Sequence, residues 1–288
     1  MSNKLRPMTP LCNLTGIHYQ MDEKEYRMAP AIAGSDAKHI LPPKSPAHYA
    51  AHMAGETKRE QTKAMLLGTM SHLAVLEPNK LDAAFVEKPE GKEGDFRTKE
   101  GKEWKAKMGT TPILDADEAR AVRGIRDSIA AHDAAKALLA DCDSEVAMFA
   151  EHRTGLWIKG RVDALKVESD NEAIIVDVKT TSAGADYGTF SRQAASLNYH
   201  VSAAWYCHLA GLNGLPPARF YWIAVEVAPP FAVAVYEIHP DALDLGVGMM
   251  NDALELIAQC EDAGEWPGYA PEVQCLNLPA WVYGKGAQ

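Results

Sequence analysis

Residues 173–181 read Ala173-Ile174-Ile175-Val176-Asp177-Val178-Lys179-Thr180-Thr181, an apolar, β-branched run that carries two charges two residues apart. Such a run predicts a strand buried on both faces. Because side chains alternate along a strand, Asp177 and Lys179 share one face. A buried carboxylate and a buried ammonium are costly unless they are paired or bind a metal. The stretch therefore indicates either a structural salt bridge or part of a metal-dependent phosphodiesterase, which requires further ligands from elsewhere.

Two more strands are predicted directly before this one, at residues 145–151 and 157–167, and short turns make the three an antiparallel meander. The middle strand carries Asp163, so Asp163 and Asp177 are expected to face each other across neighbouring strands. Two carboxylates close to an imidazole form a site suited to Mg²⁺ or Mn²⁺. Lys179 beside them is suited to positioning or deprotonating a water, or to stabilising charge on a phosphate.

The remaining pattern predicts an α/β core with a mostly helical N-terminal part. After the meander we expect one long helix or two at 187–210, strands at 219–227 and 231–238, and a helix at 241–263. Before it, an extended lead-in at 1–30 precedes a short helix near 35–41 and helices at 45–53, 58–76 and 116–139. One domain over 1–288 is expected, divided into a helical part (1–140) and an α/β catalytic core (141–288).

The helix predicted at 58–76 contains Gly68-Thr69-Met70-Ser71-His72. A lone histidine on a helix is more often a core or surface residue than a metal ligand. His72 therefore gains a functional interpretation only if other ligands converge on it.

Residues 88–107 hold seven basic and five acidic residues, a positive balance in an otherwise acidic chain. The segment is interpreted either as a solvated face or as an arm that contacts DNA phosphates and stacks an aromatic ring on the nucleic acid. The candidate contact residues of this segment are Arg97, Lys99, Lys102 and Trp104.

The chain has 39 acidic and 29 basic residues and a formal charge of −10. This excludes a surface uniformly coated in positive charge, but a local basic groove or a metal-holding acid cluster is compatible with an acidic total. The five cysteines are scattered without a CxxC pair, which favours a reducing cytoplasm over a disulfide framework. No apolar run reaches about 18 residues, so we expect no membrane span and a soluble protein in the cytoplasm.

Several motifs in order resemble a known nuclease superfamily. Gly160-Arg161-Val162-Asp163 and Ile175-Val176-Asp177-Val178-Lys179-Thr180 resemble the PD-(D/E)XK nucleases, and Gly68 to His72 followed by Leu76-Glu77-Pro78 resembles the histidine motif of their RecB-like branch. Asn198 to Tyr206, Glu265-Trp266-Pro267 and Leu276 to Trp281 are similar to the nuclease domain of the exonuclease VIII (RecE) family and its phage relatives. The resemblance covers about residues 16–283.

The resemblance implies a restriction-endonuclease-like core, with a mixed five-stranded sheet flanked by helices. It further implies a Mg²⁺-dependent 5′→3′ exonuclease on double-stranded DNA, with Mn²⁺ as a substitute ion, acting in phage-type recombination inside a bacterial host cell. The implied assembly is a homo-oligomeric ring, trimeric or tetrameric, that threads DNA and works with a RecT-like single-strand annealing protein. A ring channel lined by basic residues would reconcile DNA binding with the negative total charge. The candidates for such DNA contacts in the channel or arm are Arg97, Lys99, Lys102 and, on the middle strand of the meander, Arg161.

The resemblance also assigns roles to residues. His72, Asp163, Asp177 and the backbone carbonyl of Val178 match the family's metal ligands, and Lys179 matches its catalytic lysine. The family usually has Gln-x-x-x-Tyr on the helix after the meander; here Tyr206 matches, but Ser202 stands where Gln is expected.

Because Ser202 replaces the family's Gln, it stays open which group makes the phosphate or water contact of that Gln side chain. His200 and Gln193 are candidates. Glu151, on the strand before Asp163, is a weaker candidate for an outer metal contact. Two other functions stay open: an endonuclease of the same superfamily, and a non-catalytic DNA-end-binding protein with a decayed nuclease fold.

Overall fold

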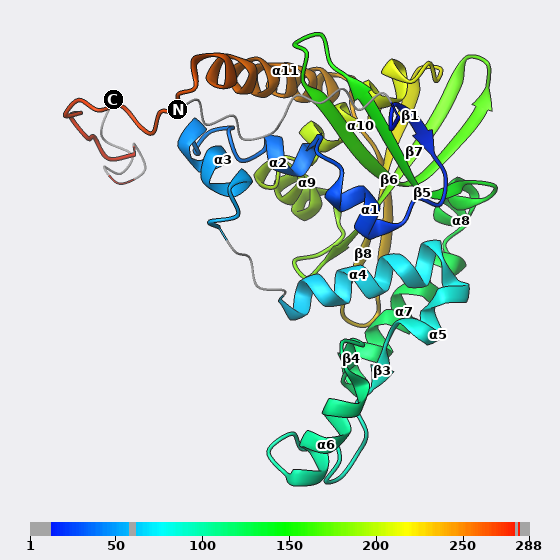
Figure 1. Ribbon diagram of the computed structural model, residues 1–288. Helices are drawn as coiled ribbons and strands as arrows, with labels where there is room; N and C mark the ends of the chain where they lie inside the picture. Colours follow the sequence, from blue (N-terminus) through cyan, green and yellow to red (C-terminus); the bar gives the residue numbers. More distant parts are fainter. Residues whose placement is uncertain (1–12, 58–61, 280–281, 283–288) are drawn as a thin grey trace.

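The computed structural model describes residues 13–57, 62–279 and 282, and in them a seven-stranded sheet forms the centre of the chain (Figure 1). The strands follow the order β1-β5-β6-β7-β8-β9, and β2 pairs with β6. Their bounds are β1 (Gly16–His18), β2 (Ile32–Ala33), β5 (Asp143–Glu151), β6 (Trp157–Ser169), β7 (Glu172–Thr181), β8 (Ala218–Glu226) and β9 (Val233–Glu237). All five predicted strands are present, and the short strands β1 and β2 were not predicted.

The predicted meander is confirmed, since β5, β6 and β7 pair antiparallel in sequence order. The turn between β5 and β6 closes where the Gly155 amide donates to the His152 carbonyl, 2.8 Å away, and Gly155 has a φ of 78° that favours glycine. β7 pairs parallel with β8, and β8 pairs antiparallel with β9. The sheet is therefore mixed, as the resemblance implies.

The parallel pair requires a crossover, which two helices provide: α9 (Tyr187–Ser196) and α10 (Tyr199–Leu212). Asn198 separates them in the left-handed conformation, with a φ of 52°, so the predicted segment 187–210 is two helices and not one. α10 lies against β5, β6 and β8, and α11 (Pro240–Ala263) packs on α10. Trp205 and Leu209 of α10 are fully buried in this part of the core.

A second group of helices packs on the sheet through α7 (Ala116–Ala131), α8 (Asp133–Leu139) and α4 (Lys63–Leu76). Ile125 and Ile129 of α7 meet Val176 and Val178 of β7 in one apolar cluster. The prediction of one helix over 116–139 is wrong, because the backbone is extended at His132, whose ring accepts from the Ala135 amide and caps α8. α4 packs along α7 and contacts β6 and β7.

From residue 13 onward the N-terminal lead-in is more structured than predicted, while its residues 1–12 lie outside the described part of the chain. It contains α1 (Glu23–Met28), whose first turn is capped by the Asp22 carboxylate, followed by α2 (Gly34–Ala37) and α3 (Pro46–Met53). Asp22 accepts from the amides of Lys24 and Glu25, an N-cap that the sequence Asp-Glu-Lys-Glu offers.

The charged segment at 88–107 extends away from the sheet (Figure 1). It contains α6 (Lys99–Met108), and its base is a parallel pair of β3 (Val86–Glu87) and β4 (Ile113–Leu114). The 3-10 turn η1 (Pro78–Lys80) and α5 (Leu81–Ala84) connect α4 to it. Residues 58–61 of the predicted helix and Ala280 and Trp281 of the last motif lie outside the described residues.

Candidate active site

Three neighbouring strands bring three carboxylates into one row across the sheet. In the β5–β6 ladder, Ser144 pairs with Ala164 and Val146 pairs with Val162. Glu145 therefore lies opposite Asp163. The β6–β7 ladder, continued one step beyond Ala164 and Val176, puts Asp163 opposite Asp177, as predicted. Side chains directly opposite each other on antiparallel strands share a face of the sheet.

His72 reaches this row from α4. Its Nδ1 lies 3.4 Å from Asp163 Oδ2. His72, Glu145 and Asp163 each offer one ligand atom, and the three atoms lie within 4.8 Å of one another. A nitrogen and two carboxylate oxygens at this spacing are a donor set that divalent cations accept.

Asp163 is held in its ionised form. The Val178 amide donates a 2.7 Å hydrogen bond to its Oδ2. Burial opposes ionisation, but His72, Lys179 and this amide together lower the pKa of Asp163 to about 2. Burial likewise disfavours the charged form of His72, yet the adjacent Asp163 carboxylate raises the pKa of His72.

Asp177 and Lys179 form the salt bridge that their spacing on one strand face predicts, with Nζ 2.5 Å from Oδ1. Burial raises the pKa of Asp177, although Lys179 opposes this. Burial would lower the pKa of Lys179, but the charge of Asp177 outweighs it and the pKa is raised. The second oxygen of Asp177, Oδ2, is buried and has no hydrogen-bond partner among the described residues. A cation beside Asp163 would supply one, so these residues fit a divalent metal.

Glu145 is a site residue that the sequence reasoning missed. It begins the apolar part of β5, and a carboxylate directly before a run of buried residues (Val146 to Ala150) is the signal that was available. Its backbone has a φ of 55° and its carboxylate accepts from Arg161 Nε at 2.7 Å. Burial raises the pKa of Glu145, and Asp163 adds to the effect.

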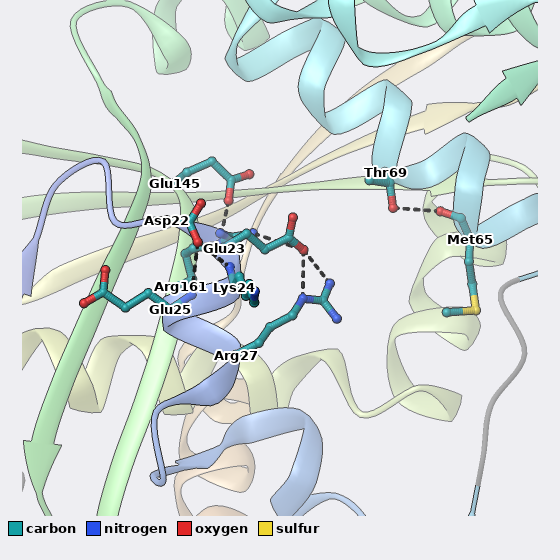
Figure 2. A network of polar contacts seen from close by, with 9 residues as sticks. All are labelled: Asp22, Glu23, Lys24, Glu25, Arg27, Met65, Thr69, Glu145 and Arg161. Carbon is teal, nitrogen blue, oxygen red and sulfur yellow. Dashed lines mark hydrogen bonds and ion pairs between the residues drawn. The ribbon is translucent and has the colours of Figure 1, made fainter. Parts of the chain in front are cut away.

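The row opens onto a cavity of 870 Å³ between α4, β5, β6 and α1. His72, Glu145, Asp163, Arg161 and Tyr206 are among the residues that line it. Glu23 of α1 lies between two guanidinium groups here, 4.0 Å from Arg161 and 2.5 Å from Arg27 (Figure 2). Glu23 therefore links the first turn of α1 to Arg161 in the wall of the cavity.

Two candidates for outer contacts lie elsewhere. Glu151 is exposed at the far end of β5, six residues from Glu145 or roughly 20 Å along a strand. Glu151 is therefore not part of the cluster with His72 and Asp163, whereas Glu145 on the same strand is. His200 Nε2 lies 3.2 Å from Met249 Sδ, so this ring faces α11.

Gln193 and Tyr206 lie closer to the site. The Gln193 amide oxygen accepts from Thr181 Oγ1 at 2.8 Å, and its nitrogen donates to the Tyr199 hydroxyl at 3.3 Å. Gln193 thus fixes Tyr199, whose ring centre lies 5.2 Å from Lys179 Nζ. Tyr206 lies half-buried in the cavity wall, and desolvation raises the pKa of its hydroxyl.

The candidate DNA-contact residues fall in two places. Arg97, Lys99, Lys102 and Trp104 lie on the projecting segment, where Arg97 pairs with Asp95 and Trp104 stacks near Phe96. Arg161 lies apart from them, in the wall of the cavity next to Glu145.

Residues 35–279 match the family described as a PDDEXK-like domain of unknown function. The chain belongs to this PDDEXK-like family. The match confirms the resemblance to the PD-(D/E)XK nucleases, a class of enzymes that use divalent metals, and the fold class with it.

Solved structures similar to this PDDEXK-like domain include one from Eubacterium rectale named "Putative exonuclease", with a TM-score of 0.63 and 13% identity. The alignment covers 94% of this chain and 100% of that one. A phage-related exonuclease from Haemophilus somnus aligns with a TM-score of 0.32 and 13% identity, covering 82% of this chain and 96% of the other. No curated protein matches the chain. Within the described residues, no helix is both long and apolar enough to span a membrane.

Proposed function

We propose that this PDDEXK-like domain is a metal-dependent 5′→3′ exonuclease that hydrolyses phosphodiester bonds from the ends of linear double-stranded DNA. The observation that carries the proposal is the convergence of His72, Asp163, Asp177 and Lys179, which come from one helix and two strands. Four ionisable groups that share a largely buried cluster beside a large cavity lower stability, and such clusters are typical of reactive sites. The name of the Eubacterium rectale structure agrees with the activity.

The proposed ligands are His72, Asp163, Asp177 and the Val178 carbonyl, to which the geometry adds Glu145. Mg²⁺ held by them, or Mn²⁺ in its place, would polarise the scissile phosphate and lower the pKa of an attacking water.

The chain's own residues supply the remaining chemistry. Lys179 is positioned by two neighbours, the Asp177 carboxylate and the face of the Tyr199 ring. An ammonium fixed in this way stabilises the negative charge that builds on the phosphate oxygens in the transition state. Asp163, ionised across the physiological pH range, keeps the His72 ring oriented through their contact.

The DNA path and assembly belong to the same proposal. The projecting segment, with Arg97, Lys99, Lys102 and Trp104, would contact the duplex away from the cavity, and Arg161 would contact the strand inside it. A homo-oligomeric ring, trimeric or tetrameric, would enclose the duplex. A RecT-like annealing protein would receive the single strand that the enzyme leaves in recombination.

The test is digestion of linear duplex DNA with either its 5′ or its 3′ ends blocked, with Mg²⁺ and with EDTA, beside a covalently closed circle. We expect Mg²⁺-dependent release of nucleotides from unblocked 5′ ends and no cutting of the circle. Cleavage of the circle would instead establish an endonuclease. Binding of ends without hydrolysis under any divalent metal would establish a non-catalytic end-binding protein.

A further inference from the structure

A second cavity, of 460 Å³, adjoins the one that contains the carboxylates. Tyr26 and Tyr206 line both, so the two cavities share a wall. The ionisable nitrogen groups in the second cavity are Lys38, His39 and Lys44. No carboxylate is among its described lining residues, although acidic residues outnumber basic ones in the chain. We call it the Lys38 cavity.

Lys38 follows α2 directly and points to the start of α10. Its Nζ donates to Ser202 Oγ at 2.7 Å and to the Leu197 carbonyl at 3.1 Å. Both acceptors are neutral, and no described carboxylate forms an ion pair with this ammonium. Burial lowers the pKa of Lys38 to about 8, the nearby Lys179 adds to the effect, and the charge of Asp177 opposes it only in part. A partly buried cation held only by neutral acceptors is stabilised when an anion binds.

The same ammonium is linked to the catalytic lysine through one aromatic ring. Lys38 Nζ lies 5.9 Å and Lys179 Nζ 5.2 Å from the centre of the Tyr199 ring. Gln193 fixes that ring by its bond to the Tyr199 hydroxyl. The Tyr199 ring therefore lies close to both ammonium groups. Lys179 is paired with Asp177, and Lys38 lines the Lys38 cavity.

We propose that the Lys38 cavity binds a phosphate group of the DNA strand that is being hydrolysed, with the Lys38 ammonium as its principal ligand. The inference rests on the proposed function, because a strand cut in the first cavity carries its neighbouring phosphates past the shared wall of Tyr26 and Tyr206. The proposal also explains why serine can replace the family's Gln at position 202. Serine leaves room at this position for an ammonium from α2, which it holds by a hydrogen bond.

The test is DNA binding without turnover, measured by fluorescence anisotropy in Ca²⁺ over a range of salt concentrations. The probes are blunt 20-base-pair duplexes that differ only in carrying a 5′-phosphate or a 5′-hydroxyl. The proteins are the wild type, Lys38→Met, Lys38→Arg and the control Lys136→Met, which removes an exposed lysine of α8. Melting curves by circular dichroism show that each variant folds. Lys38→Gln, which keeps a hydrogen-bond donor, replaces the methionine variant if that one does not fold.

We expect Lys38→Met to weaken binding about tenfold and to lower the slope of log K against log salt by about one, as loss of one phosphate contact does. Lys38→Arg keeps most of the affinity, and Lys136→Met behaves as wild type. Equal losses on both duplexes identify a phosphate within the strand. A loss confined to the 5′-phosphorylated duplex identifies the terminal phosphate.

Wild-type affinity and salt slope in Lys38→Met, or in Lys38→Gln where that variant replaces it, would overturn the inference. Failure of the proposed function has a different signature, because it shows as absent hydrolysis by the wild-type protein in Mg²⁺, while the anisotropy measurement does not depend on turnover.

Discussion

At the scale of single residues, the two interpretations of Asp177 and Lys179 turn out to be compatible. They form a salt bridge, and the same carboxylate lies opposite Asp163, which contacts His72. In an ordinary structural ion pair, the buried oxygens of the acid are hydrogen-bonded. Here Asp177 Oδ2 is buried and has no partner among the described residues. Pairing holds Lys179 charged and fixed, and the remaining oxygen is available to a metal.

We expect Asp177→Asn to lower the rate of DNA hydrolysis by about a thousandfold, because loss of one charged ligand of the proposed metal site would remove roughly 4 kcal/mol of transition-state stabilisation. The amide has nearly the same shape, so folding should be retained. Initial rates on linear duplex, with a melting curve as control, provide the measurement. A variant that digests DNA at the wild-type rate would remove Asp177 from the site.

The two acids of β5 provide a matched pair for testing Glu145. We expect Glu145→Gln to weaken Mn²⁺ binding about tenfold or more, since its carboxylate lies with His72 and Asp163, whereas Glu151→Gln leaves the affinity unchanged. Isothermal titration calorimetry measures this directly and independently of activity. Equal affinities in the two variants would show that Glu145 serves only to hold Arg161.

At the scale of elements, the break between α9 and α10 positions the residues around Lys179. Asn198 takes the left-handed conformation there, so α10 starts at Tyr199, beside the end of β7. Asparagine tolerates this conformation better than most residues, and glycine tolerates it best. The junction therefore depends on a backbone conformation and not on a side-chain cap, since Asn198 makes no cap hydrogen bond.

We expect Asn198→Val to lower the free energy of unfolding by about 1–2 kcal/mol, because a β-branched residue is strained at positive φ. Asn198→Gly should stay within about 0.5 kcal/mol of the wild type. Urea denaturation of both variants tests the prediction. A valine variant as stable as the glycine variant would show that the segment relaxes to another conformation.

At the scale of the whole molecule, the β5–β6 turn is packed against α10 and α11 through His152, which is buried, and His208, which is half-buried. The rings of His152 and His208 lie 5.2 Å apart, with Arg153 and Glu255 beside them. Burial, followed by the charges of His208 and Arg153, lowers the pKa of His152 to about 4. Burial also lowers the pKa of His208.

These histidines make stability dependent on pH. The unfolded chain binds a proton near pH 6.5, whereas folded His152 stays neutral down to about pH 4. Protonation therefore favours the unfolded state, and we expect the melting temperature to fall as the pH drops from about 6.5 towards 4. His152→Gln should reduce this slope compared with the wild type in melting curves at pH 7.5 and pH 5. An unchanged slope would show that other groups control it.

Much of the fold was predictable because its signals are local. The β-branched runs of β5, β6 and β7 and the short turns between them specify an antiparallel meander from neighbouring residues alone. The helix breaks at His132 and Asn198 were missed or left open, since apolar spacing continues across them. The helix α1 was not predicted, because a six-residue helix has too short a pattern to recognise.

The sequence by itself determined the order of motifs and the pair Asp177 and Lys179, because alternation along one strand depends on the strand alone. Only the tertiary structure decided which more distant groups lie around that pair. Strand register brings Glu145, and not Glu151, to Asp163, and the packing of the N-terminal segment on α10 brings Lys38 to Ser202. Both depend on how elements far apart in the chain pack together, which no local pattern encodes.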